Sequence, residues 1–249
     1  MKSICVHIYC NIMLIHLLSM STLDILINDI ILNITNFLNT YDKLMFLSIT
    51  KNQHMLKDKI CYEDKIVIGE ILTLWYYDRF TNISIELFNR KLPTLITHLT
   101  IGRNFKQDII DCIPNSVTHL TFGDSFSQTI KDCVKIPKSV THLTLDEYWK
   151  QHGKDFMPDS ITHLTIKSIH NINIKNCMSN SITHLAIYGS FNKDIKGCIP
   201  NSVTHLTFGD EFDQDIEGCI PESVIELCLP KETYSSVMNI HDNCKIILI

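Results

Sequence analysis

The chain is poor in the residues that mark fibrous, disordered or nucleic-acid-binding proteins. Its 249 residues include only 8 glycines and 7 prolines, which excludes collagen-like and low-complexity proteins. Charged residues make up 20% of the chain, the formal net charge is −5, and no stretch is rich in lysine or arginine. The basic surface that binds DNA or RNA is therefore missing. Apolar residues make up 45%, which is enough to bury a sizeable core.

The sequence also lacks the familiar motifs of catalysis and metal binding. It contains no GxSxG, Walker loop, HExxH or glycine-rich dinucleotide turn, and no CxxC pair of the zinc-ribbon kind. No serine or cysteine nucleophile recurs beside a base and an orienting acid. We therefore predict a protein that is not an enzyme, with no catalytic residues, no metal site and no cofactor.

Residues 1–19 leave three interpretations open. Lys2 and the apolar run after it resemble a signal peptide, but His7, Asn11 and His16 interrupt the run and no A-x-A-type cleavage site follows. The segment is also short for a membrane span. It is an over-extended start before Met20, an extra helix, or a targeting segment or anchor. We favour the first interpretation and expect a cytoplasmic protein that is not attached to a membrane.

Residues 23–60 carry apolar side chains at helical spacing. The first such face comprises Ile27, Ile30, Ile31, Ile34, Phe37 and Leu38, which lie three or four residues apart along the chain. Asn39 and Thr40 break this run, and Asp42 then falls in the first turn of a second helix, where a negative charge is favoured. A third short helix is expected near residues 51–59. We call residues 23–60 the helical head. A unit this small needs a partner or the rest of the chain for its stability.

A repeat of about 21 residues fills the next part of the chain. The tripeptide Thr-His-Leu occurs at 97–99, 118–120, 141–143, 162–164, 183–185 and 204–206. Successive copies are offset by 21 residues, apart from one offset of 23, and residues 225–227 form a degenerate seventh copy. Such a fixed period is the sequence signature of a solenoid, in which each copy packs only against its neighbours.

Each copy has the spacing of one β-strand followed by a short return segment. Leu120 and Phe122 alternate with polar residues, as on a half-buried strand. The return segments repeat an aromatic, an isoleucine and a cysteine, which must stack in rows. The aromatic row comprises Phe105, Phe126, Trp149, Phe191 and Phe212; the isoleucine row comprises Ile109, Ile130, Ile174, Ile195 and Ile216. The copies therefore predict a parallel sheet in a leucine-rich-repeat-like solenoid.

We expect the following domains. Residues 1–19 are the apolar leader, 23–60 a helical domain, 61–92 a linker and amino-terminal cap, 93–229 the repeats, and 230–249 a carboxyl-terminal cap. Phe80, Ile83 and Ile85 have strand spacing and should form the first coil. The apolar residues 246–248 should close the other end, because an uncovered terminal coil exposes its apolar rows. The predicted fold class is α+β.

The repeated cysteines allow two chemical states. The row comprises Cys112, Cys133, Cys177, Cys198 and Cys219. Parallel stacking would bring Cys198 and Cys219 within reach of a disulfide. Reduced thiols are the alternative that we favour, because a reducing cytosol keeps buried cysteines reduced.

Half of the twelve histidines occupy one repeat position, on the face of the strands opposite the core. We expect this face to be the concave side of the solenoid. The candidate partner-binding residues on it are His98, Thr100, His119, Thr121, His142, Thr144, His163, Thr165, His184, His205 and Thr207. Three interpretations remain: a polar stack without a binding role, a stripe that contacts a partner protein, or a metal site, which is the weakest because no carboxylate or cysteine recurs beside the histidines. Stacked imidazoles should also resist protonation, so stability should fall below about pH 6.

The repeat resembles the FNIP repeat, a relative of the leucine-rich repeat. The resemblance rests on Ile-Pro-Asn-Ser-Val at 113–117 and 199–203, on Gly-x-x-Phe, and on the trailing Ile-x-x-Cys-Ile-Pro. Residues 26–51 in turn resemble an F-box, although Ile27 stands where that family usually has proline. An F-box followed by such repeats resembles proteins of amoebae and giant DNA viruses.

The F-box resemblance implies docking onto the adaptor subunit of an SCF-type (cullin-RING) ubiquitin ligase. The adaptor-binding residues that it implies are Leu26, Ile27, Ile30, Ile34, Leu38, Leu44 and Leu47. The repeats would then bind a target protein, and the chain would be a monomer apart from that complex. The alternative, which the missing proline favours, is a stand-alone repeat scaffold or decoy whose helices merely cap the solenoid.

Overall fold

The computed structural model describes residues 21–85, 92–102, 113–123, 136–147, 157–168, 174, 178–234 and 240–249. Three helices come first: α2 (Ser21–Thr35), α3 (Thr40–Phe46) and α4 (Lys51–His54). The Asn39 side chain accepts a hydrogen bond from the Asp42 backbone amide at 2.8 Å, which starts α3 at the predicted break. Thr50 caps α4 in the same way, through the Gln53 amide at 3.1 Å.

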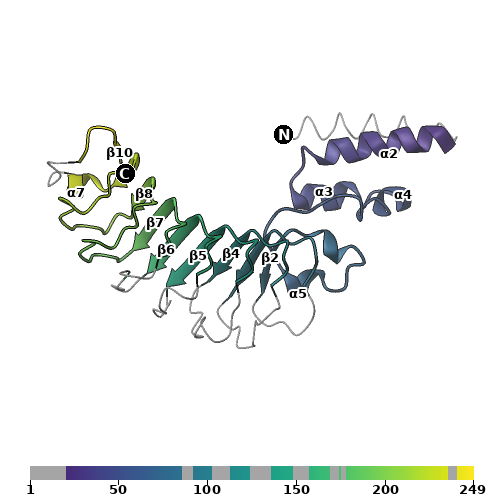
Figure 1. The fold of residues 1–249 in the computed structure, drawn as a ribbon. Coiled ribbons are helices and arrows are strands. Elements are labelled where there is room, and N and C mark those ends of the chain that lie inside the picture. Colours follow the sequence, from purple (N-terminus) through teal and green to yellow (C-terminus); the bar gives the residue numbers. More distant parts are fainter. Residues whose placement is uncertain are drawn as a thin grey trace.

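A parallel sheet follows the helices, and Figure 1 shows its strands succeeding one another along an arc. Its strands are β1 (Ile66–Val67), β2 (Asn82–Ile85), β3 (His98–Ile101), β4 (His119–Phe122), β5 (His142–Glu147), β6 (His163–Ser168), β7 (His184–Gly189), β8 (His205–Phe208), β9 (Glu226–Leu229) and β10 (Lys245–Leu248). Each strand pairs with the next one along the chain. The predicted solenoid with a parallel sheet is confirmed.

The pairing keeps equivalent residues of successive copies side by side. Leu99 pairs with Leu120, and Leu120 with Leu143, although that second pair is separated by the offset of 23 residues. The two additional residues are therefore accommodated outside the strands. Each strand of this part buries its leucine and the apolar residue two positions later, to 2% exposure or less. These inward rows form the core of the solenoid, because a single copy could not cover them.

The return segments complete this core where the structure describes them. Phe191, Phe212, Ile195, Ile216 and Ile174 are all buried, as the row pattern predicts. The Phe191 and Phe212 rings lie 6.1 Å apart and nearly parallel. The other members of the aromatic, isoleucine and cysteine rows, apart from Cys198 and Cys219, lie outside the described residues. Cys198 and Cys219 are not joined by a disulfide, and burial raises the pKa of the Cys219 thiol.

Both ends of the sheet contain short elements beyond the repeats. Ile83 and Ile85 lie on β2 as expected, but β1 pairs with the outer side of β2, so this coil is not the terminal one. A short helix, α5 (Ile68–Ile71), and a 3-10 turn, η1 (Tyr77–Arg79), lie between β1 and β2. At the other end α7 (Lys231–Tyr234) precedes β10, which contains the apolar residues 246–248. None of the helices in the described ranges has the length and apolarity that crossing a membrane requires.

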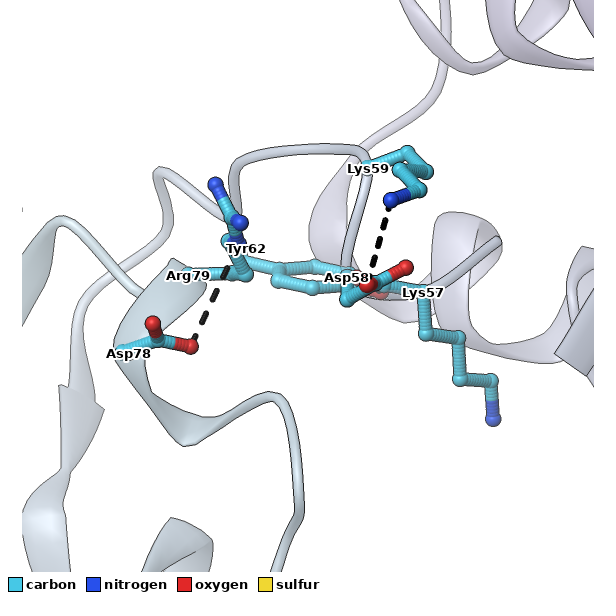
Figure 2. Close-up of polar contacts among 6 residues, drawn as sticks. All are labelled: Lys57, Asp58, Lys59, Tyr62, Asp78 and Arg79. Atoms are coloured by element: carbon cyan, nitrogen blue, oxygen red, sulfur yellow. Dashed lines mark hydrogen bonds and ion pairs between the residues drawn. The ribbon is translucent and has the colours of Figure 1, made fainter. Parts of the chain in front are cut away.

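Tyr62 joins the helical head to the first coil of the solenoid. Its ring is fully buried, stacks on Phe80 at 4.6 Å and lies 5.7 Å from Tyr76. Its hydroxyl donates a hydrogen bond to the Lys57 carbonyl at 3.3 Å, and burial raises its pKa. Figure 2 shows this ring between Asp58 on one side and Arg79 on the other. Asp58 pairs with Lys59 at 3.4 Å and Arg79 with Asp78 at 4.0 Å (Figure 2).

Polar contacts hold the second helix against the same segment. The Asp64 carboxylate accepts a hydrogen bond from the Thr40 amide at 2.7 Å, and this bond lowers the pKa of Asp64. The Lys43 ammonium group donates to the Cys61 carbonyl at 3.1 Å. Both contacts span about 20 residues of sequence, so the head is anchored to the solenoid, as its small size requires.

Candidate functional site: a row of histidines on the open face of the sheet

The open face of the sheet, opposite the core, carries six imidazoles in one continuous stack. We call these residues the histidine row: His98, His119, His142, His163, His184 and His205. Each is the first residue of its strand, so the register of the sheet aligns them. Neighbouring ring centroids are 4.0 to 4.2 Å apart, and the planes are inclined by 7° to 19°. Strand pairing therefore produces the predicted row.

Every histidine of the row is held by the threonine that precedes it in the sequence. These threonines are Thr97, Thr118, Thr141, Thr162, Thr183 and Thr204, each with its hydroxyl oxygen 2.9 Å from the Nδ1 of the next residue. The same hydroxyls lie 3.1 to 3.5 Å from a backbone carbonyl of the preceding coil. A hydroxyl has one proton, so it can donate to only one of these two acceptors.

The tautomer of each imidazole decides which contact takes that proton. A hydroxyl that donates to the carbonyl accepts a hydrogen bond from Nδ1–H, so both contacts are then satisfied, whereas an Nδ1 without a proton accepts from the hydroxyl. The carbonyls are shared: that of Thr97 also accepts the backbone amides of Thr118 at 2.9 Å and His119 at 3.0 Å, and the later copies repeat this pattern. In either tautomer the contact with the threonine hydroxyl fixes the orientation of the ring.

The stack disfavours the protonated imidazole. Burial, followed by the nearby His142, His98 and His163, lowers the pKa of His119 to about 4. Burial and neighbouring imidazoles also lower the pKa values of His142, His163 and His184. The central residues are therefore neutral at pH 7, although an isolated histidine is already partly charged near that pH.

The geometry of the row does not suit a metal ion. A ligating imidazole directs its nitrogen lone pair at the metal from about 2.0–2.1 Å, within the plane of the ring. Nearly parallel rings about 4 Å apart direct their lone pairs side by side, so two of them cannot meet at one ion. Within the part of the chain that the structure describes, no group of three or more histidine, cysteine, aspartate or glutamate side chains could hold a metal.

Threonines form a second row on the open face, beside the histidines. It comprises Thr100, Thr121, Thr144, Thr165 and Thr207, with Ala186 in the remaining copy. Further along the three longest strands, Asp146, Lys167 and Tyr188 are in register with one another. The structure thus brings all the sequence-predicted residues of this face together. The threonines before the histidines were not anticipated as their holders, although their strict recurrence in Thr-His-Leu was a visible signal.

The seven residues implied as adaptor-binding are placed unequally. Ile30 is exposed, whereas Ile27, Ile34, Leu38 and Leu44 are half-buried against the core. Leu47 is fully buried and packs inside the head in this structure. The side chain of Leu26 lies outside the described residues.

Other apolar side chains of the head are more exposed than these. Phe37, Tyr41 and Met45 are 90%, 69% and 56% exposed. Tyr41 and Met45 are four residues apart and share one side of α3. The helical pattern placed Phe37 on the apolar face with Ile30, but Tyr41 and Met45 were missed.

The fold and the rows of the open face define a solenoid of the leucine-rich-repeat type. The sequence model of the FNIP Repeat matches residues 86–125, 108–134, 126–168 and 191–232, which together are half of the chain. The chain belongs to the FNIP repeat family. The crystal structure of CroV588, a circular leucine-rich-repeat protein, aligns with 67% of this chain and 25% of its own, at 36% identity and a TM-score of 0.50.

Two proteins of Acanthamoeba polyphaga mimivirus are also similar. One, provisionally named an FNIP repeat-containing protein, is 33% identical over 85 residues, which are 33% of this chain and 22% of that protein. The other, provisionally named an F-box protein, is 29% identical over 87 residues, which are 35% of each chain. The chain therefore spans about a third or less of the length of these curated relatives. Repeat solenoids of this kind are typically non-catalytic.

Proposed function

We propose that the chain is a non-catalytic substrate receptor of an SCF-type ubiquitin ligase. Its helical head docks on the adaptor subunit, and its repeats hold a target protein. The chain supplies proximity and orientation, while the partner enzymes carry out the chemistry. It acts in the cytoplasm, as a monomer apart from this complex.

The observation that carries the proposal is the apolar surface left exposed on an anchored head. Phe37, Tyr41, Met45 and Ile30 are 44% to 90% exposed on a unit that is hydrogen-bonded to the solenoid through Thr40. Large exposed apolar side chains grouped on one small unit are typical of protein-binding surfaces. The similarity to a protein provisionally named an F-box protein supports the same assignment.

Co-purification with an adaptor tests the proposal. The full chain is co-expressed with the adaptor subunit of a host ligase, beside an Ile30→Asp/Phe37→Asp variant. Both positions are exposed, so the folded head should tolerate the change. The control is Leu95→Asp/Ile225→Asp, which places the same charges on exposed apolar residues of the solenoid. Adaptor retained by the parent and the control, and lost only from the head variant, is the expected result.

The second candidate is a stand-alone repeat scaffold or decoy without a ligase. It is favoured by Ile27, which stands in the place of the usual F-box proline and packs against the core. A folded parent that retains no adaptor, or a head variant that retains as much as the parent, would favour this candidate.

A further inference from the structure

Two cysteines occupy the same place in successive return segments. Cys198 and Cys219 are separated by 21 residues, the usual period of the repeat. Each follows a glycine in the left-handed region, Gly197 at φ 68° and Gly218 at φ 65°. The backbone amide of each cysteine donates to the isoleucine carbonyl three residues earlier, at 2.9 and 3.0 Å. The two turns therefore have the same conformation, and both cysteine side chains leave the backbone in the same direction.

The coils that carry these cysteines are in direct contact on both sides of them. Before the cysteines, the Asn192 side-chain carbonyl accepts hydrogen bonds from the Asp213 amide at 3.0 Å and from the Gln214 side chain at 2.8 Å. After them, the Ser223 hydroxyl donates to the Val203 carbonyl at 2.8 Å. Neighbouring strands lie about 4.7–4.9 Å apart, and a disulfide requires Cα atoms about 4.4–6.8 Å apart. The stacking of the coils therefore places the two cysteines within reach of one disulfide.

The surroundings of the pair keep it reduced until an oxidant arrives. Both side chains are half-buried, so a small oxidant reaches them. Burial and then the Asp194 carboxylate raise the pKa of the Cys219 thiol; Asp215 and Cys198 add to this shift, and Lys196 opposes it. A raised pKa leaves less thiolate, and in a reducing cytosol such thiols stay unpaired with one another.

We propose that Cys198 and Cys219 form a peroxide-sensitive pair, which oxidation joins into a disulfide between two adjacent coils. One thiolate attacks the O–O bond of the peroxide, which gives a sulfenic acid and releases hydroxide. The second thiolate attacks the sulfenic sulfur, so that the S–S bond forms as the S–O bond breaks and a second hydroxide leaves. The two sulfurs lose two electrons, and hydrogen peroxide gains them and takes the two thiol protons to become two waters. Glutathione reverses the change by thiol–disulfide exchange.

The disulfide would tie together the coils that precede β8 and β9. It closes a loop of about 20 residues and thereby constrains the unfolded chain, so the oxidised protein should unfold at a higher urea concentration than the reduced protein. The return segments lie opposite the open face, and oxidation therefore stiffens this part of the solenoid without altering the histidine row. The inference goes beyond the proposed function and does not depend on the ligase.

Non-reducing peptide mapping of the unmutated chain tests the proposal. The full chain is reduced, freed of reductant and treated with hydrogen peroxide at about pH 8, where more of each thiol is ionised, and the remaining thiols are alkylated. It is then digested with a protease that cleaves after glutamate, because Glu211 and Glu217 separate the two cysteines, whereas no lysine or arginine does. We expect a linked peptide pair that contains Cys198 and Cys219 and is lost on addition of reductant.

The same oxidation in concentrated urea is the control for the folded geometry. There the cysteines pair without the stacking of the coils, so the yield of this linkage should fall and other linkages should replace it. Absence of the linkage from the folded chain, or an equal yield in urea, would overturn the proposal. A linked chain with the urea midpoint of the reduced chain would overturn the stiffening that we infer from it.

Two serine variants are matched to each other. Cys198→Ser should form no linkage through Cys219, whereas Cys228→Ser, which removes another half-buried thiol from the adjacent strand β9, should form the linkage of the parent. A Cys198→Ser variant in which Cys219 is linked as efficiently to another cysteine would contradict the pairing. The outcome is independent of adaptor co-purification, so failure here and failure of the ligase proposal remain distinguishable.

Discussion

Acidification should destabilise this protein through the histidine row, well before its carboxylates are protonated. In the folded chain the pKa of His119 is lowered to about 4, whereas it is about 6.5 in an unfolded chain. The unfolded state therefore binds more protons below about pH 6.5, and stability falls as the pH decreases from there towards the folded-state value. His142, His163 and His184 are shifted in the same direction and add to the loss.

The size of the effect follows from the His119 shift. Between pH 7.5 and 5.5 a pKa difference of this size corresponds to about 1.4 kcal/mol, and partial exposure of the ring reduces it to about 1 kcal/mol. For a chain of this length that is a decrease in Tm of about 2–4 °C from one histidine. Differential scanning calorimetry at the two pH values measures it.

The matched control is the His119→Gln/His142→Gln/His163→Gln variant, in which the shifted groups cannot ionise. Its Tm should change less between pH 7.5 and 5.5 than that of the parent. An unchanged Tm in the parent would refute the reasoning, and so would an equal decrease in parent and variant, because the loss would then come from other groups.

Three further changes test the packing. A methyl group at Gly209 would meet a backbone Cα of the neighbouring strand at 3.0 Å, whereas at Gly123 the nearest atom is 3.4 Å away. Gly209→Ala should therefore lower the free energy of unfolding by about 1–3 kcal/mol, and Gly123→Ala by less than about 1 kcal/mol. Equal urea midpoints for the two variants would contradict this. Tyr62→Ala should cost about 3–5 kcal/mol in chemical denaturation and Tyr62→Phe less than about 1.5, since the ring is fully buried and the hydroxyl makes one long bond. Thr162→Val should cost about 0.5–2 kcal/mol and change the imidazole nitrogen shifts of His163, which loses its 2.9 Å partner; unchanged shifts would argue against this hydrogen bond.

The repeat region could be predicted in detail because its pattern is periodic. The alternation around Leu120 and Phe122 determines which residues face the core, and the period determines which residues become neighbours. The stacking of His119 on His142 follows from these two facts. The pattern does not show which hydroxyl contacts each ring. That depends on the rotamer of the preceding threonine, and the spacing of residues in the sequence does not determine rotamers.

The head was less predictable, for a physical reason. Helical spacing indicates which residues of α2 and α3 share a face, but not which part of that face is covered. The covering segment contains Tyr62 and Asp64, about 20 residues away from α3, and no repeated pattern links them to it. Leu47 is therefore inside and Phe37 outside, although both fit the amphipathic pattern.

The spacing of 23 residues between Leu120 and Leu143 shows that the open face and the return segments can evolve independently. The strands on either side of this longer spacing remain in register, so a change in the length of a return segment leaves the open face unaltered. Selection against insertions or deletions in a return segment should therefore be weak. A shift of one residue within a strand, in contrast, would exchange its inward and outward side chains. The lineage can therefore vary the back of each coil, or duplicate whole coils, while it inherits an unchanged open face.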